Sequence, residues 1–342
     1  MLLKHISLLF FVLMLSCNDK GGTYVCPPCD LECDKLVFKE TGNCPHCKMT
    51  LIKKTELETY SNLEPNEIEF EMGSGLFLVE GGIEKSKSIT MHYHMPKNFT
   101  INSKVIFVLP GAGRNGKDYR NAWIEQSEKY GLLVLSLEYP ENHYLGFWNY
   151  NLAGMIHDVD VEKKTFKINK NPNEWIFGDF DRIFDLIKVK LNLKKDKYDM
   201  FGHSAGGQIL HRLSLFKPDN NADRILASNS GWYTVPTDLD SFPYGLKNIE
   251  LSTSEIDFTS KLTIFLGEKD DENETRGHLR HSPEVDKQGL DRISRGRYFY
   301  SYSKTQAEKT KKEFNWKIEI VPNVGHDYEE MSKWAAEYLY RQ

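Results

Sequence analysis

The 342-residue sequence has no cysteine after residue 47, so its six cysteines are confined to the N-terminal region. It also has no surplus of positive charge, because acidic and basic residues are interspersed and the formal net charge is −5. This absence excludes the basic footprint that nucleic-acid binding requires. No internal repeat is present, and the length suits one large domain with a small appendage.

The N-terminus also lacks a long apolar run, because its apolar run, residues 6–15, has only ten residues. Such a run is too short to span a bilayer and has the length of a signal-peptide core. Ser16, a small residue, directly precedes Cys17. The segment resembles a bacterial lipoprotein signal, which implies that residues 1–16 are removed and that Cys17 is lipidated. An ordinary cleaved signal or a helical anchor is the alternative. We therefore expect export, with Cys17 anchoring the chain to a membrane of the bacterial cell envelope.

Two Cys-x-x-Cys pairs, Cys26 with Cys29 and Cys44 with Cys47, are separated by fourteen residues. This spacing can close a tetrahedral site of four thiolates. Residues 24–54 hold too few apolar side chains to fold without such a staple. We therefore predict a zinc-ribbon-like module at residues 24–54, in which the four cysteines bind zinc or another soft or borderline metal.

The fifth cysteine of this region, Cys33, leaves the ligand set open. The stretches YVCPPC and GNCPHCKMTL resemble the small heavy-metal-binding domain of bacterial metal-efflux proteins. Cys29 stands where that domain usually has histidine, and this exchange favours zinc over a soft-metal carrier. Export makes disulfides an alternative. Cys33 is then the thiol left over, whereas in a metal site it is a spare ligand.

The rest of the chain divides by composition. Residues 17–23 form a polar tether, and residues 55–67 form a charged linker. Across residues 68–342, short apolar stretches that end in Gly, Pro, Asn or Asp alternate with helix-length amphipathic segments, which indicates a mostly parallel α/β sheet flanked by helices. The predicted strands are SITMHYHMP, SKVIFVLPG, YGLLVLSLEYP, KYDMFGHS, DRILASNSG, KLTIFLGEKD and WKIEIVPNVGH. Catalytic residues of such folds lie in loops at the carboxyl ends of strands.

One of these strand ends carries the pattern G-x-S-x-G, in which Ser204 lies between Gly202 and Gly206. An apolar strand precedes the pattern and a helix-forming stretch follows it. In this context a sharp turn exposes the serine hydroxyl, and the two glycines allow strand and helix to approach each other. The pattern therefore predicts Ser204 as a nucleophile.

A nucleophilic serine needs a histidine base and a carboxylate that orients the histidine. Asp270 follows the predicted strand KLTIFLG, and His326 follows the last predicted strand. The chain order Ser, Asp, His is that of α/β-hydrolases. We predict Ser204, Asp270 and His326 as a catalytic triad, with Asp271 or Glu268 as the alternative acid.

The glycine-rich loop after the strand SKVIFVLP is a candidate oxyanion hole. In nucleophile-elbow enzymes, one amide of the hole follows the nucleophile and the other comes from a loop after an earlier strand. These requirements predict the amides of Ala205, Gly111 and Ala112. A tight turn without function is the alternative for this loop.

Between residues 141 and 175 the strand and helix pattern lapses into an aromatic-rich stretch. Its rings are candidates for the wall of an apolar acyl pocket. The alternative is that they pack an insertion onto the domain. The candidates are Tyr144, Phe147, Trp148 and Tyr150, with Trp232 and Tyr233 as further candidates.

Five segments together resemble the esterase and polyhydroxyalkanoate-depolymerase-like branch of the α/β-hydrolases: PGAGRNGKDYRNAW, FGHSAGGQILHR, LGEKD, KQGLDRISRG and VPNVGHD. The resemblance covers about residues 70–342. It implies an α/β-hydrolase fold and a serine hydrolase that needs no cofactor for catalysis. We expect it to cleave small or polymeric carboxylic esters. Two alternatives remain: a metal-binding envelope protein whose hydrolase domain is silent, and a serine peptidase with the same triad.

Overall fold

The computed structural model describes residues 23–27, 32–46, 51–57, 60, 62–82 and 87–341. The predicted signal peptide and the predicted lipidation site Cys17 lie outside these residues, as do Cys29 and Cys47. Within the described ranges, every helix is too short or too polar to span a membrane.

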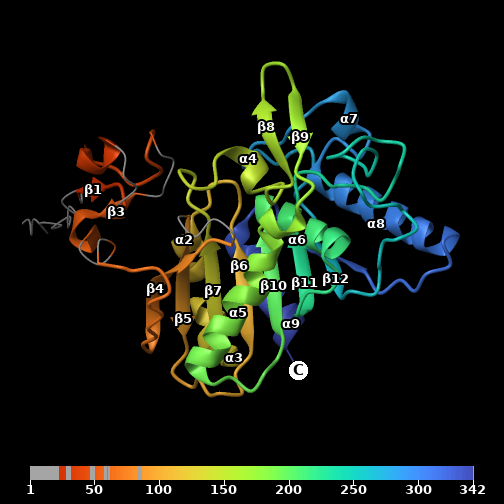
Figure 1. Cartoon of the computed structure of the whole chain (residues 1–342). Coiled ribbons are helices and arrows are strands. Elements are labelled where there is room, and N and C mark those ends of the chain that lie inside the picture. The colour runs from red at the N-terminus through yellow and green to blue at the C-terminus, as the bar shows by residue number, and fades with distance from the viewer. Residues whose placement is uncertain are drawn as a thin grey trace, which may run out of the picture.

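A mixed eight-stranded sheet forms the centre of the large domain (Figure 1). Its strand order is β13-β12-β11-β10-β6-β7-β5-β4. The strands from β13 to β7 run parallel, whereas β5 and β4 add antiparallel at one edge. Their bounds are β4 (Gly73–Glu80), β5 (Ser88–Met95), β6 (Val105–Leu109), β7 (Leu133–Glu138), β10 (Tyr198–His203), β11 (Ala222–Ser228), β12 (Leu262–Gly267) and β13 (Lys317–Val321). The predicted α/β fold class is confirmed.

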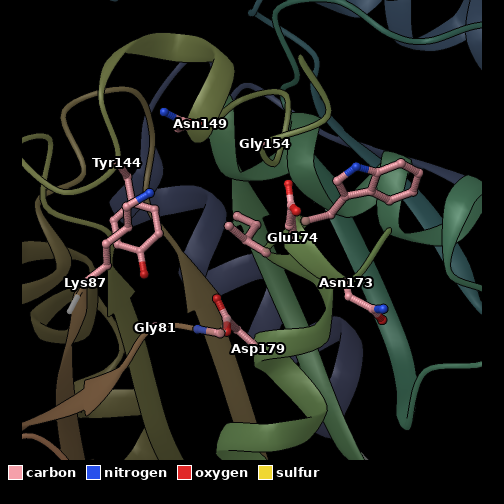
Figure 2. Close-up of a pocket in the computed structure, with 11 residues that line it drawn as sticks. Gly81, Lys87, Tyr144, Asn149, Gly154, Asn173, Glu174 and Asp179 are labelled. Carbon is pink, nitrogen blue, oxygen red and sulfur yellow. The ribbon is translucent and has the colours of Figure 1, made fainter. Parts of the chain in front are cut away.

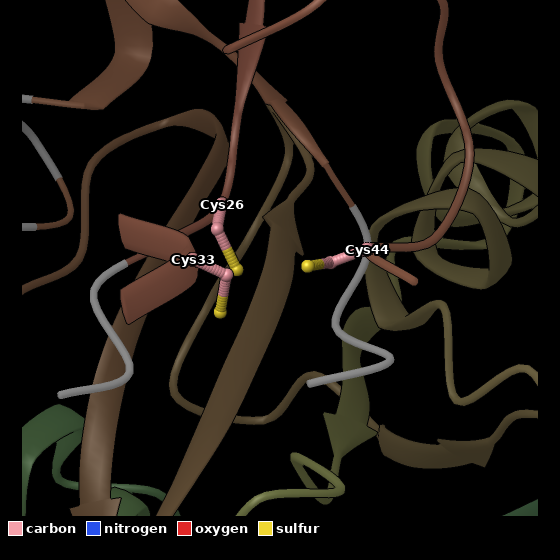
Figure 3. A group of neighbouring side chains, drawn as sticks. All are labelled: Cys26, Cys33 and Cys44. Carbon is pink, nitrogen blue, oxygen red and sulfur yellow. The ribbon is translucent and has the colours of Figure 1, made fainter. Parts of the chain in front are cut away.

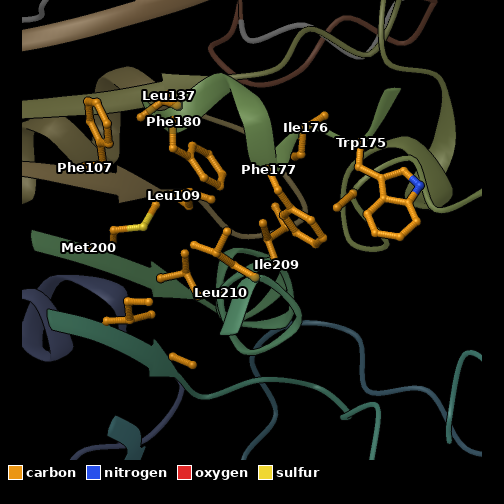
Figure 4. Close-up of a cluster of buried hydrophobic side chains, with 14 of the residues drawn as sticks. Phe107, Leu109, Leu137, Trp175, Ile176, Phe177, Phe180, Met200, Ile209 and Leu210 are labelled. Atoms are coloured by element: carbon orange, nitrogen blue, oxygen red, sulfur yellow. The ribbon is translucent and has the colours of Figure 1, made fainter. Parts of the chain in front are cut away.

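Helices bury both faces of the inner parallel strands, which explains why strands such as β6 and β12 are mostly apolar runs. In β6, Phe107 and Leu109 face one apolar cluster, whereas Ile106 and Val108 face the other. Side chains of α5, α6 and α8 belong to the first cluster, and those of α2, α3 and α9 to the second. Figure 4 shows α5 and α6 packed against β6, β7 and β10. The bounds are α2 (Gly116–Ala122), α3 (Ile124–Tyr130), α5 (Phe177–Leu191), α6 (Ala205–Phe216), α8 (Arg292–Lys309) and α9 (Tyr328–Tyr340).

The segment between β7 and α5, for which the sequence shows no regular pattern, contains secondary structure of its own. A short helix, α4 (Gly146–Asn149), is followed by a two-stranded hairpin of β8 (Ile156–Asp160) and β9 (Thr165–Ile168) and by the 3-10 turn η3 (Pro172–Glu174). The hairpin projects at the top of Figure 1, next to α7 (Pro283–Asp286). The expectation of an irregular stretch is therefore wrong for the hairpin.

The N-terminal module contains a separate three-stranded antiparallel sheet. Strand β1 (Tyr24–Val25) pairs with β2 (Val37–Phe38) on one side and with β3 (Ile52–Lys53) on the other. The 3-10 turn η1 (Glu32–Lys35) precedes β2, and η2 (Lys54–Glu56) follows β3. The described apolar cluster of this module consists of Cys26, Cys33, Cys44 and Leu51, against which Tyr24 and Phe38 pack. So small a core accords with a module that needs a further cross-link to fold.

The predicted linker makes specific contacts with the large domain. Glu56 forms an ion pair with Lys117 of α2 at 2.9 Å. Near the other end, the Asn66 backbone N–H donates to the Leu78 carbonyl at 2.9 Å. Ile68 is buried in the main core. Glu56, Asn66 and Ile68 therefore all contact the large domain.

Candidate active site

Ser204 occupies the turn between β10 and α6, with backbone angles φ 55° and ψ −111°. A positive φ is strained for a serine and is typical of a nucleophile elbow. The turn depends on close contact between strand and helix: a Cβ on Gly202 would lie 2.5 Å from the Gly206 carbonyl carbon. A Cβ on Gly206 would collide with the Leu109 carbonyl oxygen of β6. Only glycine fits at these two positions, as the sequence pattern predicts.

The elbow opens into a cavity of about 650 Å³ at the carboxyl edge of the parallel strands. Parallel strands end at the same edge, so the loops after β6, β10 and β13 meet there. The cavity brings together five predicted residues: Ser204, His326, Gly111, Ala112 and Ala205. Its volume lies in the range of small-molecule sites, about 300–1,000 Å³.

Asp270 lies behind His326, where it is 1% exposed. Its Oδ2 atom is 2.8 Å from His326 Nδ1, and its Oδ1 atom accepts a hydrogen bond from Arg292 Nη1 at 3.0 Å. A buried carboxylate is tolerated when a cation and hydrogen bonds compensate its charge, and Arg292 supplies that compensation. Among the three acids proposed from the sequence, the structure pairs Asp270 with His326. Asp271 and Glu268 instead accept hydrogen bonds from neighbouring loop residues.

The loop after β12 also holds the backbone of His326. The His326 N–H donates to Glu274 Oε2 at 2.6 Å. Arg276 donates to Glu274 at 2.7 Å and to Asp327 at 2.8 Å, so it joins the two loops. The Arg276 hydrogen bond, followed by the backbone donors of His326 and Arg276, lowers the pKa of Glu274 to about 2. Nothing in the sequence identifies Glu274, because its partner lies 52 positions away.

Asn229, at the end of β11, connects the end of β12 to the loop that precedes His326. Its Nδ2 donates to the Gly325 carbonyl at 3.0 Å, and its Oδ1 accepts from the Gly267 N–H at 2.8 Å. The side chain is fully buried. It therefore fixes the backbone next to His326 relative to the end of β12. A polar residue at the end of a predicted strand is the sequence signal that points to this position.

His203, next to the nucleophile, stays neutral beside His326. The two imidazole rings lie 4.5 Å apart, and burial lowers the pKa of His203 well below its ordinary value, assisted by the charges of His326 and Arg292. Tyr119 Oη lies 2.9 Å from His203 Nδ1. Gly111, Ala112 and Ala205, the residues predicted to form the oxyanion hole, all line the cavity that contains Ser204.

Tyr144, Trp148 and Tyr150, which the sequence analysis predicts to bind substrate, do not line the cavity that contains Ser204. Tyr150 is buried, and its hydroxyl donates to the Pro110 carbonyl at 2.7 Å. Trp148 packs against the main core, and Tyr144 lines a separate cavity of about 60 Å³ (Figure 2). These rings pack the insertion onto the domain, which is the alternative the sequence left open.

Other side chains line the cavity in their place. Phe147 and Trp232, both named from the sequence, do so. Arg276, His278 and Arg280, from the loop after β12, add positive and polar groups to the rim. This loop has neither an apolar pattern nor a motif in the sequence, so its place at the cavity follows only from the tertiary structure.

The N-terminal module contains a second candidate site. Cys26, Cys33 and Cys44 are buried, and their sulfur atoms lie within 4.8 Å of one another (Figure 3). Tetrahedral zinc with Zn–S bonds of about 2.3 Å places its sulfur ligands about 3.8 Å apart, so the three thiols fit such an ion. Cys26 and Cys44 belong to the predicted ligand set, whereas Cys33 was the cysteine without an assigned role.

No protein-family model and no curated protein matches the chain. Solved structures do match. Poly(aspartic acid) hydrolase-1 from Sphingomonas sp. KT-1 is 32% identical with a TM-score of 0.71, over 80% of this chain and 100% of that protein. A poly(3-hydroxybutyrate) depolymerase from Bordetella parapertussis is 26% identical with a TM-score of 0.71, over 79% of this chain and 91% of that one.

The parallel sheet, its flanking helices and the elbow at Ser204 define an α/β-hydrolase fold. The identity to the Sphingomonas enzyme extends over the full length of that protein. The chain belongs to the α/β-hydrolase family that includes this poly(aspartic acid) hydrolase, and it is a hydrolase.

The Glu274 clamp predicts a specific dependence of stability on pH. Its folded-state pKa is about 2, below the ordinary value of 4.5, so the ionised carboxylate stabilises the folded chain fully above pH 4.5. This contribution is lost as the pH falls from 4.5 toward 2. We expect the free energy of unfolding of Glu274→Gln to lie below that of the parent at neutral pH, and the difference to shrink over this window in urea unfolding curves.

Glu272 is the matched control, because it is an exposed carboxylate in the same loop. Glu272→Gln should follow the parent at every pH. A difference between Glu274→Gln and the parent that stays constant down to pH 2 would contradict the clamp.

Proposed function

We propose that the chain hydrolyses carboxylic esters through a covalent acyl-enzyme on Ser204. The observation that carries this proposal is the Asp270–His326 pair, 2.8 Å apart, at the wall of the cavity that exposes the strained Ser204. A carboxylate bound to Nδ1 holds the imidazole with Nε2 as the proton acceptor. The pair thus supplies the general base that a serine hydroxyl requires.

The reaction takes two acyl-transfer steps. Ser204 Oγ attacks the ester carbonyl, and His326 accepts the hydroxyl proton and then delivers it to the leaving alcohol. A water molecule, deprotonated by His326, attacks the acyl-enzyme, and His326 returns this proton to Ser204 Oγ as the acid is released. The amides of Gly111, Ala112 and Ala205 are the donors for the oxyanion, and the N-terminus of the 12-residue helix α6 lies behind Ala205. Neutral His203 keeps a second positive charge away from His326.

The names of the two relatives support polymeric substrates, since one acts on poly(aspartic acid) and the other on poly(3-hydroxybutyrate). The first is a polyamide and the second a polyester, so the names favour no single bond type. A small ester, a polyester and a peptide-like amide are therefore the substrates to compare. Amide cleavage with the same triad is the serine-peptidase alternative.

Hydrolysis of a short-chain chromogenic ester tests the proposal. Ser204→Ala removes the nucleophile, and we expect kcat to fall by about 10³-fold or more. Ser254→Ala changes an exposed serine outside the cavity and should leave kcat unchanged.

No hydrolysis by the parent would support the silent-scaffold alternative, and equal rates in the parent and Ser204→Ala would reject the nucleophile. A parent that cleaves amides and poly(aspartic acid) faster than all esters would favour the peptidase alternative.

We also propose that Cys26, Cys33 and Cys44 hold zinc together with a fourth thiol from Cys29 or Cys47. The convergence of three buried thiols supports this set over one that leaves Cys33 out. Bound zinc would serve as a structural cross-link for a module whose described apolar core is very small. The lipoprotein-like N-terminus supports a place in the cell envelope, anchored through Cys17.

Metal analysis of the full chain, purified without added metal, tests the zinc site. We expect about one equivalent of zinc and a strong loss of it in Cys33→Ser, because a tetrahedral site needs all four ligands. Removing the metal with a chelator should unfold the module while ester hydrolysis continues.

The disulfide alternative gives a different result. It predicts no zinc and a single titratable thiol among the five cysteines that follow Cys17. Full zinc retention in Cys33→Ser would instead show that Cys33 is outside the ligand set.

A further inference from the structure

A second, mostly apolar cavity adjoins the one that contains Ser204. This hairpin cavity has a volume of about 440 Å³, and its walls come from the hairpin β8–β9, the start of α7 and residues 243–244. Phe147, Trp232 and Arg280 line both cavities, so the two spaces share a wall. The hairpin and α7 lie together at the top of Figure 1. Its volume is large enough for part of a small-molecule substrate.

Large apolar side chains are exposed around the hairpin cavity. Phe147 is 39% exposed, Phe166 is 37% exposed and Val161 is 65% exposed. Single exposed apolar residues are common on protein surfaces. Three that border one apolar cavity mark a binding surface, because covering them with a ligand removes apolar area from water.

The geometry of the hairpin explains why Phe166 is available to a ligand. Residues two apart in a strand share a face, so Phe166 and Ile168 point to the same side of β9. Ile168 packs against the main core and pairs in register with the buried Ile156. That end anchors a two-stranded hairpin that would be marginal alone. Phe166 extends the same face beyond the core and over the cavity.

The wall between the two cavities is preorganised. Trp232 is 7% exposed, and its ring lies 4.3 Å from the buried Arg212 guanidinium and 5.0 Å from the Tyr244 ring. These contacts fix the indole in place. Trp232 therefore gives both cavities a fixed apolar surface. Asp160, which lines the hairpin cavity, forms an exposed ion pair with Lys163 at 3.0 Å, and Lys164, Arg280 and Glu284 also line this cavity.

We propose that the hairpin cavity binds the apolar acyl chain of an ester whose carbonyl carbon is attacked by Ser204. This inference rests on the proposed ester hydrolysis and specifies its substrate class. Two observations support the acyl assignment: the exposed apolar side chains border the hairpin cavity, and polar side chains such as Asn115, Gln208 and His278 line the Ser204 cavity. Across the shared wall, the apolar hairpin cavity suits the chain.

A series of p-nitrophenyl esters from acetate to octanoate tests the inference with the full chain in detergent. Burying one methylene raises kcat/KM by about threefold to fourfold, so we expect the parent to prefer octanoate over acetate at least tenfold. Phe166→Ser should lower the octanoate-to-acetate ratio of kcat/KM by at least fivefold. Phe166→Leu should retain the ratio within about twofold.

The control is Val189→Ser, which removes an 82% exposed apolar side chain on α5, outside both cavities. It should leave the ratio unchanged. The ratio does not depend on the fraction of folded protein, so a less stable variant still gives a valid result. A parent without long-chain preference, or an unchanged ratio in Phe166→Ser, would overturn the inference. If the parent hydrolyses no ester, acetate included, ester hydrolysis itself fails.

Discussion

The close approach of helix α6 to strands β6 and β10 is the constraint on which the candidate active site depends. Gly202 and Gly206 leave no room for a Cβ, and this contact forces Ser204 into a positive φ. The strained turn is maintained because the surrounding sheet and helices are buried on both sides. Strain at one residue is therefore compensated by the packing of the whole domain.

The same architecture assembles the remaining groups. The oxyanion-hole loop, Asp270 and His326 follow the carboxyl ends of β6, β12 and β13. The register of these parallel strands therefore sets the relative positions of the three groups. Buried polar contacts then set the exact positions of these groups. Arg292 donates a hydrogen bond to Asp270, and Asn229 connects the ends of β11 and β12 to the loop before His326. Glu274 accepts a hydrogen bond from the His326 backbone. Each contact leaves a buried or partly buried polar group unsatisfied if one partner is removed.

The sequence predicts most of the sheet and the residues at its strand ends. The seven predicted strands correspond to β5, β6, β7, β10, β11, β12 and β13. Burial on both faces produces the continuous apolar runs of strands such as β6, whereas β13 alternates exposed and half-buried residues. Strand β4 was not predicted, since this edge strand begins with the glycine-rich GSG. The hairpin β8–β9 was missed because its sequence is highly charged and only its anchored end packs against the core.

Sequence patterns could not predict the contacts between loops that lie far apart in the sequence. Arg292 lies 22 positions from Asp270, and Glu274 lies 52 positions from His326, with no periodicity that connects them. The aromatic stretch shows the same limit. Phe147 and Tyr150 are three positions apart, yet Phe147 lines the cavity and Tyr150 is buried below the Pro110 loop. Aromatic composition predicts a packed or binding region, and only the backbone path decides between the two roles.

The most direct test of this account is to label the full chain with a fluorophosphonate, which reacts with activated serines, and to locate the adduct by peptide mass spectrometry. The structure predicts a single adduct on Ser204, formed much more slowly in His326→Ala because the base is missing. An adduct on another serine, or equal labelling rates in the parent and His326→Ala, would contradict it.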